Sequence, residues 1–320
     1  MLITSAALVC GFALLVLGGE TLVRGSVSVA NRAGVSPLLI GLTVVGFGTS
    51  SPELLTSVQA ALLGSPGIAV GNVVGSNIAN ILLILGFIAV IHPVHADPRA
   101  FYRDGSMVAI STIICTLAAL TGEFTRLMGI GFIAFLIGYI VLSFIKERNS
   151  SDPSAQLHTE EAKAVEAGPH SLPWALALTV GGLIMTLVGA RLLVDASIDL
   201  ARAFGISETV IGLTLVALGT SLPELVTAIV AAIRHQPEIA FGNVIGSCIY
   251  NLLGILGVTA IVLPIPVPPE IVHIDLWIML AATAAMLIFT VLGWRLSRPE
   301  GAVLLVGYGG YIAWMACRIG

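Results

Sequence analysis

The sequence predicts an all-α polytopic membrane protein in which ten transmembrane helices form two inverted five-helix repeats. Three observations support this fold class: an apolar composition, a series of long charge-free segments, and an internal duplication. Of the 320 residues, 57% are hydrophobic and only 10% are charged, and the mean hydropathy is +1.03. A water-soluble domain of this length could hardly stay in solution with that composition, so we expect the chain to lie in a bilayer.

Long segments without Asp, Glu, Lys or Arg define the expected helices. A helix that crosses the hydrocarbon core needs about 20 mostly apolar residues, so the longest segments must also contain a turn. The first span lacks a basic leader and its pattern continues past Arg24, so we do not expect a removable signal peptide. The ten expected spans are residues 2–31, 37–62, 68–91, 105–122, 125–145, 172–203, 207–232, 238–263, 273–293 and 300–317.

The distribution of basic residues predicts the orientation, because Lys and Arg accumulate in cytoplasmic connections. With the N-terminus outside, ten of these side chains fall on the cytoplasmic side and four on the other. Both termini are therefore expected outside the cell membrane. The net charge of −4 gives no sign of a nucleic-acid partner. The cysteines lack the spacing of a metal or redox site and are expected to be packing residues.

An internal duplication is the dominant feature of the sequence. Residues 41–53 read GLTVVGFGTSSPE and residues 212–224 read GLTLVALGTSLPE, with nine of thirteen positions identical at an offset of 171. The same offset aligns residues 68–86 with residues 239–257 without a gap, and thirteen of these nineteen positions agree. The chain therefore consists of two copies of one unit.

The number of spans in each copy predicts how the copies are related. Each half holds five spans, an odd number, so the second copy must enter the membrane from the opposite side. Inverted repeats of this kind are common in secondary transporters, whose substrate site lies at the repeat interface near mid-bilayer. The expected division is a first repeat at 1–145, a hydrophilic cytoplasmic linker at 146–170 with eight charges, and a second repeat at 171–320.

Glu53 and Glu224 occupy equivalent places inside apolar sequence. Ionisable groups at that depth are costly, and a functional role is the default interpretation. A protonated packing Glu is the alternative, but it does not explain why the duplication kept both. Each Glu follows a proline, which has no N–H and crowds the carbonyl four residues earlier, at Gly48 or Gly219. The helices should break there and leave carbonyl oxygens free.

Neutral oxygens accompany the two carboxylates. In the second and seventh spans the hydroxyls either join a site or only satisfy the helix break; they belong to Thr49, Ser50, Thr220 and Ser221. In the third and eighth spans a serine and an asparagine four residues apart share a helix face, and glycines let that face approach a neighbour. These residues are Ser76, Asn80, Ser247 and Asn251. Asn72 and Asn243 are either ligands or interhelical contacts and are not assigned.

This set of donors predicts a site for a hard cation. Carboxylate, hydroxyl, amide and carbonyl oxygens suit calcium, sodium or magnesium, and the absence of a central His or Cys argues against zinc or copper. Two negative charges balance one divalent ion or two monovalent ions. Competition for the same carboxylates would give exchange, with alternating access produced by one part of the molecule rocking past another.

Two further pairs of charges are related by the duplication. Glu20 is equivalent to Arg191, and Arg24 is equivalent to Asp195, so the signs are swapped between the halves. Within each half, one helical turn separates the two residues, a spacing that permits ion pairing. We expect structural ion pairs here rather than part of an ion pathway.

The two GTSxPE segments, each followed by a GSxxxN segment, resemble the alpha repeats of the sodium/calcium exchanger family within the calcium/cation antiporter superfamily, in its prokaryotic type. The resemblance implies Ca²⁺ and Na⁺ as transported ions, no cofactor, and long first and sixth spans that slide against the remaining bundle. It implies ion ligands at Thr49, Ser50, Glu53, Ser76, Asn80, Thr220, Ser221, Glu224, Ser247 and Asn251.

Departures from relatives within the superfamily refine this expectation. Some relatives have Asp where this chain has Asn251, and in potassium-dependent members that acid is tied to potassium binding, so potassium dependence is not expected. Proton/calcium exchangers typically place the glutamate in a GNxxE context. Here the acid follows GTSxP, which favours sodium as the driving ion.

The sequence leaves three alternatives to a sodium-driven antiporter. Proton-driven exchange would use the two glutamates as proton carriers. A cation channel would need a continuous pore, which a kinked and duplicated site does not favour. An intramembrane hydrolase would need an activated nucleophile or a metal-binding His, and none of the six histidines is expected in mid-span. We expect a secondary transporter and not an enzyme, surrounded by lipid and functional as a monomer.

Overall fold

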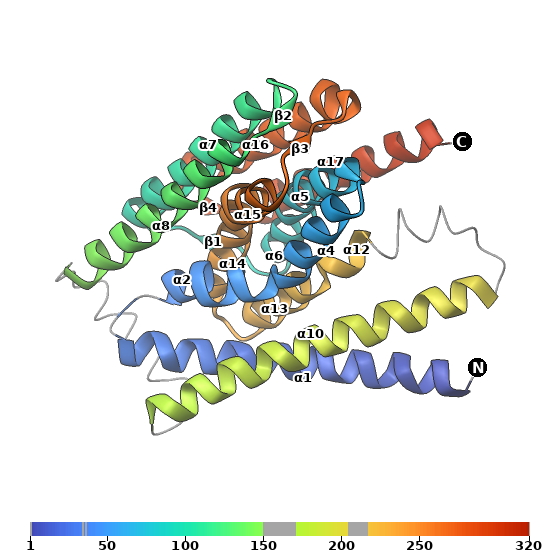
Figure 1. Cartoon of the computed structure of the whole chain (residues 1–320). Helices are drawn as coiled ribbons and strands as arrows, with labels where there is room; N and C mark the ends of the chain where they lie inside the picture. Colours follow the sequence, from blue (N-terminus) through green and yellow to red (C-terminus); the bar gives the residue numbers. More distant parts are fainter. Residues whose placement is uncertain (1, 34, 36, 150–170, 204–216, 320) are drawn as a thin grey trace.

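The computed structural model describes residues 2–33, 35, 37–149, 171–203 and 217–319, and its regular structure is almost entirely helical (Figure 1). The first half contains α1 (Leu2–Ala33), α2 (Pro37–Ile40), π-helical η1 (Gly41–Val45), α3 (Gly46–Thr49), α4 (Ser51–Leu62), α5 (Pro66–Ile78), π-helical η2 (Ala79–Leu85), α6 (Gly86–Ile91), β1 (Val94–His95), α7 (Pro98–Ala119), β2 (Glu123–Phe124) and α8 (Arg126–Asn149).

The second half repeats this order of elements in its described residues, with one additional π-helical segment, Ile271–Asp275, at the start of the helix equivalent to α7. It contains α10 (Leu172–Ala203), α12 (Ala217–Thr220), α13 (Leu222–Ile233), α14 (Pro237–Ile249), π-helical η4 (Tyr250–Ile255), α15 (Leu256–Val262), β3 (Ile265–Pro266), π-helical η5 (Ile271–Asp275), α16 (Leu276–Gly293), β4 (Arg295–Leu296) and α17 (Arg298–Ile319). The linker expected at 146–170 lies mostly outside the described residues, and α8 continues through its first residues to Asn149.

Helix boundaries follow the charge-free segments of the sequence. The spans expected at 2–31 and 172–203 are α1 and α10. The span expected at 105–122 begins earlier, at Pro98, because the charges in the added turns are paired: Arg103 lies against Asp104 at 2.6 Å. The span expected at 207–232 begins outside the described residues and continues as α12 and α13.

Six helical stretches in the described part of the chain are long and apolar enough to cross a membrane. They are Ala6–Ala33, Pro66–Ile91, Arg126–Lys146, Leu172–Leu192, Pro237–Val262 and Ile271–Gly293. The other expected spans are shorter, interrupted or less apolar. α7 and α17, for example, are each 22 residues long but carry charges in their first turns.

Two of these stretches form the centre of the bundle. In the most apolar window of Pro66–Ile91, 72% of residues are buried, and in that of Pro237–Val262 the share is 83%; in the other four it is about a third or less. Burial on all sides explains why these segments are apolar all round and rich in small residues. Cys248 is buried in the second stretch, and Cys115 of α7 is buried against it, with Sγ 3.8 Å from the Leu252 carbonyl; both are free thiols.

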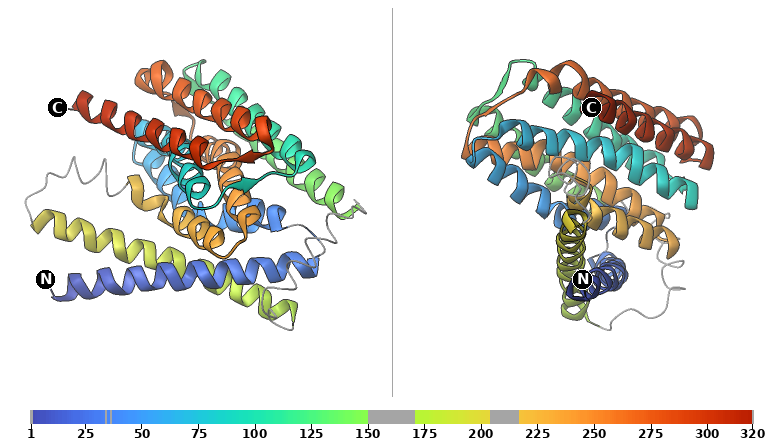
Figure 2. Two further views of the ribbon diagram at one scale, coloured as in Figure 1. Left: turned by 180° about the vertical axis from the view of Figure 1, so that it is seen from behind. Right: turned by 90° about the vertical axis from the view of Figure 1, so that its right-hand side faces the viewer.

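The long helices α1 and α10 lie side by side and antiparallel along one face of the other helices, as Figures 1 and 2 show. Glycines at intervals of seven residues let them approach closely. A Cβ added at Gly18 would lie 2.6 Å from the backbone nitrogen of Thr186, and one added at Gly25 would lie 2.5 Å from that of Thr179. Only glycine fits at such crossings, so the pair packs backbone to backbone.

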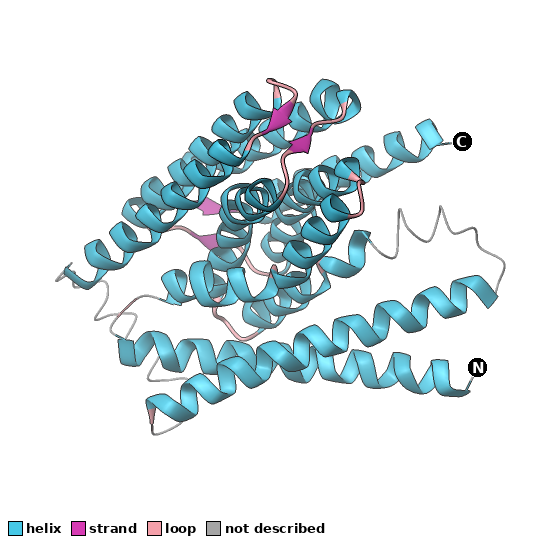
Figure 3. Cartoon of the chain, in the orientation of Figure 1, coloured by secondary structure: helices cyan, strands magenta, loops and turns pink. Residues whose placement is uncertain are grey.

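Two short antiparallel strand pairs join the halves crosswise (Figure 3). β1 pairs with β4 through Val94 and Leu296, and β2 pairs with β3 through Phe124 and Ile265. The two sheets lie at opposite ends of α7, whose 22 residues rise about 33 Å. Equivalent strands of the two halves therefore lie at opposite ends of the molecule.

Candidate ion-binding site

The second span of each half breaks where the sequence predicts. α3 ends at Thr49 and α4 begins at Ser51, with Ser50 between them at φ −82° and ψ +10°. In the second half, Ser221 occupies the same place at φ −91° and ψ +5°. The following proline sits in the first turn of the next helix, where no backbone donor is needed. Each break thereby places a Glu in the first turn of a helix.

Glu53 and Glu224 are each held by a serine of the opposite half. Ser50 Oγ donates to Glu224 Oε1 at 2.8 Å, and Ser221 Oγ donates to Glu53 Oε1 at 3.2 Å. Both carboxylates are 1% exposed. The duplication therefore brings its two acids together in one buried place, through bonds that cross between the repeats.

The hydroxyls before the serines lie beside the same carboxylates. Thr220 interacts with Glu53, and Thr49 interacts with Glu224. Glu53 also lies close enough to Glu224 for the two charges to repel each other. No Lys or Arg among the described residues forms an ion pair with either acid. Two neighbouring carboxylates in a low-dielectric interior attract a cation.

Eight buried side-chain oxygens in the described structure lack a hydrogen-bond partner, and four of them belong to residues that the duplication makes equivalent. These four are Glu53 Oε2, Glu224 Oε2, Asn80 Oδ1 and Asn251 Oδ1, two equivalent pairs. Buried polar atoms are normally satisfied, so a symmetric set of unsatisfied acceptors requires an explanation. An electropositive ligand satisfies acceptors of this kind, and a bound cation is such a ligand.

π-helical turns carry the two asparagines. Asn80 lies in η2 and Asn251 lies in η4. η2 packs against α13, which begins next to Glu224, and η4 packs against α4, which begins next to Glu53. Single π-helical turns inside α-helices are frequent at functional sites because they re-aim side chains and loosen the backbone ladder.

The remaining expected ligands lie at the same crossing of helices. Ser247 Oγ donates to the Gly46 carbonyl at 3.2 Å, so α14 contacts α3, the last turn before the helix break. Ser76 is buried at the equivalent place in α5. Gly48 faces α10, since a Cβ there would lie 2.7 Å from Leu183 Cδ2, and Gly219 is buried beside the second break.

Asn72 and Asn243, which the sequence left unassigned, hold the backbone of the two acids. Asn72 Nδ2 donates to the Glu53 carbonyl at 3.2 Å, and Asn243 Nδ2 donates to the Glu224 carbonyl at 3.3 Å. Asn243 also accepts a hydrogen bond from Thr49 at 3.2 Å, across the repeat interface. The repeated Gly-Asn pair was the available signal for this role.

The structure contains a second symmetric pair of acids that the sequence did not predict. Tyr139 donates to Asp104 at 2.7 Å, and Tyr311 donates to Asp275 at 2.9 Å. The aspartates are 171 residues apart, whereas the tyrosines are 172 apart, so a one-residue insertion hides the relationship. These acids have partners and tie α7 to α8 and η5 to α17.

The expected ion pairs of the long helices are present. Glu20 Oε1 lies 2.6 Å from Arg24 Nε, and Asp195 Oδ2 lies 3.8 Å from Arg191 Nε. Both pairs lie away from the buried acids. Glu20 has a further partner from another helix, Arg234, which the sequence analysis did not predict.

A buried, symmetric, all-oxygen site between two halves of an apolar helical protein is the arrangement of a membrane transporter for cations. Comparison with known proteins defines the class more closely. The sequence profile of the family described as sodium/calcium exchanger protein matches residues 4–145 and 174–316. The chain belongs to the sodium/calcium exchanger family, and it is accordingly a multi-pass membrane protein and an antiporter rather than an enzyme.

Individual relatives span almost the whole chain. The putative antiporter CaxA of Alkalimonas amylolytica is 35% identical, over 97% of this chain and 98% of its own. The sodium/calcium exchanger MaX1 of Methanosarcina acetivorans is 33% identical, over 95% and 96%. The solved structure of the sodium-calcium exchanger NCX_Mj soaked with 10 mM Na⁺ and zero Ca²⁺ aligns with a TM-score of 0.83 at 32% identity, covering 98% of this chain and 99% of that chain.

Proposed function

We propose that this protein exchanges Ca²⁺ for Na⁺ across the cell membrane by alternating access at the site between Glu53 and Glu224. The observation that carries the proposal is the set of four unpartnered buried oxygens on two acids and two asparagines. The ligands would be the ten side chains named above, with the carbonyls of Gly48 and Gly219. Sodium and calcium prefer such hard oxygen donors.

Charge balance gives the exchange its coupling. Two carboxylates neutralise one Ca²⁺ or two Na⁺. One of these two sets of ions must therefore be bound before the protein can enclose both acids. An empty pair would leave two repelling charges in a low-dielectric site, which disfavours movement without ions. The obligatory occupancy distinguishes an exchanger from a channel.

The proposed membrane arrangement has ten spans in two inverted repeats, at 1–145 and 171–320, joined by a cytoplasmic linker at 146–170. The crossed pairing of β1 with β4 and β2 with β3 supports an inverted relation. The excess of Lys and Arg on one side supports termini outside the cell, and it puts Arg234 and the β1–β4 sheet at the cytoplasmic end. We propose that a monomer surrounded by lipid is sufficient, since both carboxylates come from one chain.

Sodium is the proposed driving ion. MaX1 is named a sodium/calcium exchanger, and NCX_Mj is described as a sodium-calcium exchanger. CaxA is named only a putative antiporter, so its driving ion does not bear on the choice. The hydroxyl-rich surroundings of both acids favour an ion that needs several neutral oxygen ligands over a proton, which needs one.

Purified protein in sealed vesicles tests the proposal. Vesicles loaded with sodium and diluted into sodium-free buffer with labelled calcium should accumulate calcium, and vesicles with a pH gradient but no sodium should not. Glu53→Gln and Glu224→Gln should each nearly abolish accumulation while the protein still elutes as a single folded species. Uptake driven by the pH gradient alone would favour proton exchange, and normal uptake in either variant would defeat the site.

A further inference from the structure

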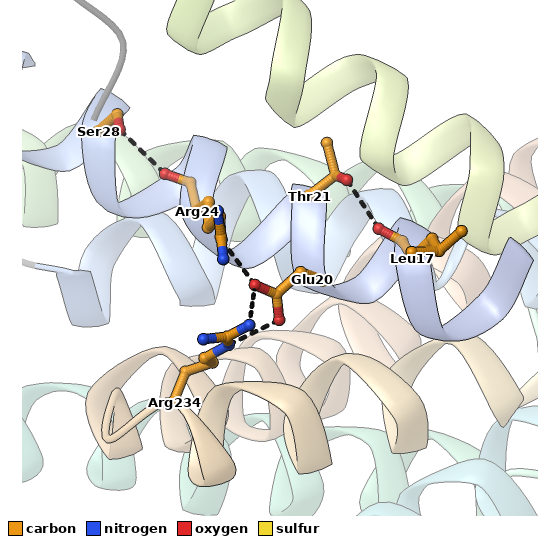
Figure 4. A network of polar contacts seen from close by, with 6 residues as sticks. All are labelled: Leu17, Glu20, Thr21, Arg24, Ser28 and Arg234. Carbon is orange, nitrogen blue, oxygen red and sulfur yellow. Dashed lines mark hydrogen bonds and ion pairs between the residues drawn. The ribbon is translucent and has the colours of Figure 1, made fainter. Parts of the chain in front are cut away.

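Glu20 is the centre of an ion cluster that joins two separate parts of the molecule (Figure 4). Arg24, one turn along α1, contacts Glu20 Oε1 at 2.6 Å. Arg234, directly after α13, donates from Nε to Glu20 Oε2 at 2.7 Å, and its Nη2 contacts Oε1. The guanidinium of Arg234 therefore contacts both carboxylate oxygens of Glu20. This bidentate geometry adds directional specificity to the ion pair.

The backbone around Glu20 also packs directly on α13. A Cβ added at Gly19 would lie 3.3 Å from side-chain atoms of both Val226 and Val230. Glycine at this position lets α1 approach α13 closely, and the Arg234 contact fixes how far along α13 the helix sits. α1 and its partner α10 are thus held at the end of the bundle that contains β1, β4 and Arg234.

This attachment has no counterpart in the other half of the described structure. α1 packs along α13, but α4, the equivalent of α13, has only sparse contacts with either α10 or α1. Leu63, at the end of α4, is 82% exposed. The two long helices therefore rest against one end of the core bundle and not the other.

The charges explain why the halves differ. The duplication puts Arg191 in the place of Glu20 and Leu63 in the place of Arg234. Arg191 and Leu63 cannot form an ion pair. In the second half, Arg191 has an exposed side chain and lies 3.8 Å from Asp195. Of these two equivalent pairs, only Glu20 and Arg234 can form an ion pair between a long helix and a short helix.

Arg24 makes the bridge reversible. It moves with Glu20, because both residues belong to α1. When α1 leaves α13, Glu20 keeps one cationic partner, so the cost of parting is smaller than that of exposing an unpaired acid to a low-dielectric environment. A bond that breaks at moderate cost suits a moving part better than a permanent anchor.

We propose that the Glu20–Arg234 pair is a one-sided latch that biases the exchanger toward the state closed at the Arg234 end. The inference rests on the proposed alternating access, in which α1 and α10 slide against the rest. Symmetric repeats alone would make the two access states similar in energy. A latch on one side shifts that balance and gives the two membrane faces different exchange properties.

A cysteine in α13 at its contact with α1 can show whether the Glu20–Arg234 latch is closed or open. The parent chain would carry Cys10→Ser and Cys317→Ser, which remove the exposed thiols, and Val230→Cys, which puts a thiol beneath Gly19. Its labelling by a membrane-impermeant maleimide from the Arg234 side measures how often α1 leaves α13. Glu20→Gln or Arg234→Leu should raise the labelling rate about two- to fivefold, the range expected for partly exposed ion pairs. Arg234→Leu installs the residue of the equivalent site, so it is a second variant if Glu20→Gln folds poorly.

Three comparisons make the result decisive. The charge swap Glu20→Arg with Arg234→Glu should restore slow labelling, and Arg191→Gln, the equivalent residue, should leave it unchanged. Faster labelling that persists in the swap, or unchanged labelling in Glu20→Gln and Arg234→Leu, overturns the latch. Sodium-driven calcium uptake by the same vesicles separates the two proposals: its absence in the parent defeats the proposed function, whereas normal uptake with unchanged labelling defeats the latch alone.

Discussion

Ser50 and Glu224, 174 residues apart in sequence, share a hydrogen bond of 2.8 Å at the centre of the protein. The reciprocal bond joins Ser221 to Glu53 at 3.2 Å. Each acid therefore has one oxygen held by the opposite repeat and one oxygen without a partner. A cation that binds both acids touches both halves at once, which links its binding to the relative position of the halves.

Replacing Ser50 with alanine tests this crossed bond. Hydrogen bonds to charged groups contribute about 1.5–3 kcal/mol, so Ser50→Ala should raise the calcium concentration for half-maximal exchange roughly tenfold or more. Calcium uptake measured across a range of calcium concentrations gives this value. Ser51→Ala is the matched control, because the hydrogen bond that the described structure gives Ser51 Oγ goes to the Phe47 carbonyl of the same span, at 3.4 Å. Equal half-saturation in the two variants would show that the crossed bond does not position Glu224.

Two substitutions of Asn251 separate a ligand from a packing residue. Asn251→Leu keeps the branch at Cγ, with a somewhat larger side chain, but removes the unpartnered oxygen, so calcium should bind about tenfold more weakly, as expected when a buried polar partner is lost. Asn251→Asp keeps the oxygen and adds a charge, and calcium affinity rises with ligand charge. Calcium binding by titration calorimetry should therefore change in opposite directions. If both variants weaken binding equally, Asn251 has a packing role only.

Periodicity and duplication made most of the helical layout and the positions of the two acids predictable. The helix break follows from local chemistry, because a proline interrupts the helix whatever the tertiary packing around it. The partners of the acids do not follow in the same way. Which serine meets Glu53 depends on the packing of two halves, and the sequence predicts Ser221 near a break but not its bond to the opposite Glu.

Contacts between helix ends that are distant in sequence could not be predicted either, because they also depend on how the two halves pack. The spacing of Glu20 and Arg24 predicts a pair within α1, since the geometry of one helix is known in advance. Arg234 lies 214 residues from Glu20, and nothing in the repeat pattern links them because the equivalent positions hold Arg191 and Leu63. The Tyr139–Asp104 contact was hidden similarly by the one-residue change of offset.

The two equivalent asparagines should differ in importance for stability. Among the described residues, the side chain of Asn72 hydrogen-bonds within its own half, to the Glu53 carbonyl and to Ser57 Oγ. Asn243 instead hydrogen-bonds both to Glu224 and to Thr49 of the other half. Asn243→Ala removes the donor to the Glu224 carbonyl and the contact with Thr49 across the interface, although Thr49 keeps its bond to the Val45 carbonyl at 3.0 Å. The loss should cost about 1–3 kcal/mol. The substitution should lower the thermal unfolding temperature in detergent more than Asn72→Ala does. A larger effect of Asn72→Ala would contradict the cross-repeat role of Asn243.

Neighbouring glycines in α10 test the close packing of the two long helices. A Cβ at Gly182 would lie 2.7 Å from Leu22 Cα and 2.9 Å from the Gly18 carbonyl oxygen, whereas one at Gly181 would meet nothing within 4 Å. Alanine adds the same helix propensity at both positions, up to about 1 kcal/mol. Gly182→Ala should therefore destabilise by about 1–3 kcal/mol, since backbone cannot move aside easily, while Gly181→Ala should be neutral or stabilising. Thermal unfolding of both variants gives the comparison, and equal shifts would mean that α1 and α10 do not meet along this line. If α1 and α10 slide as one body, as the proposed alternating access requires, Gly182→Ala should also slow calcium exchange where Gly181→Ala does not.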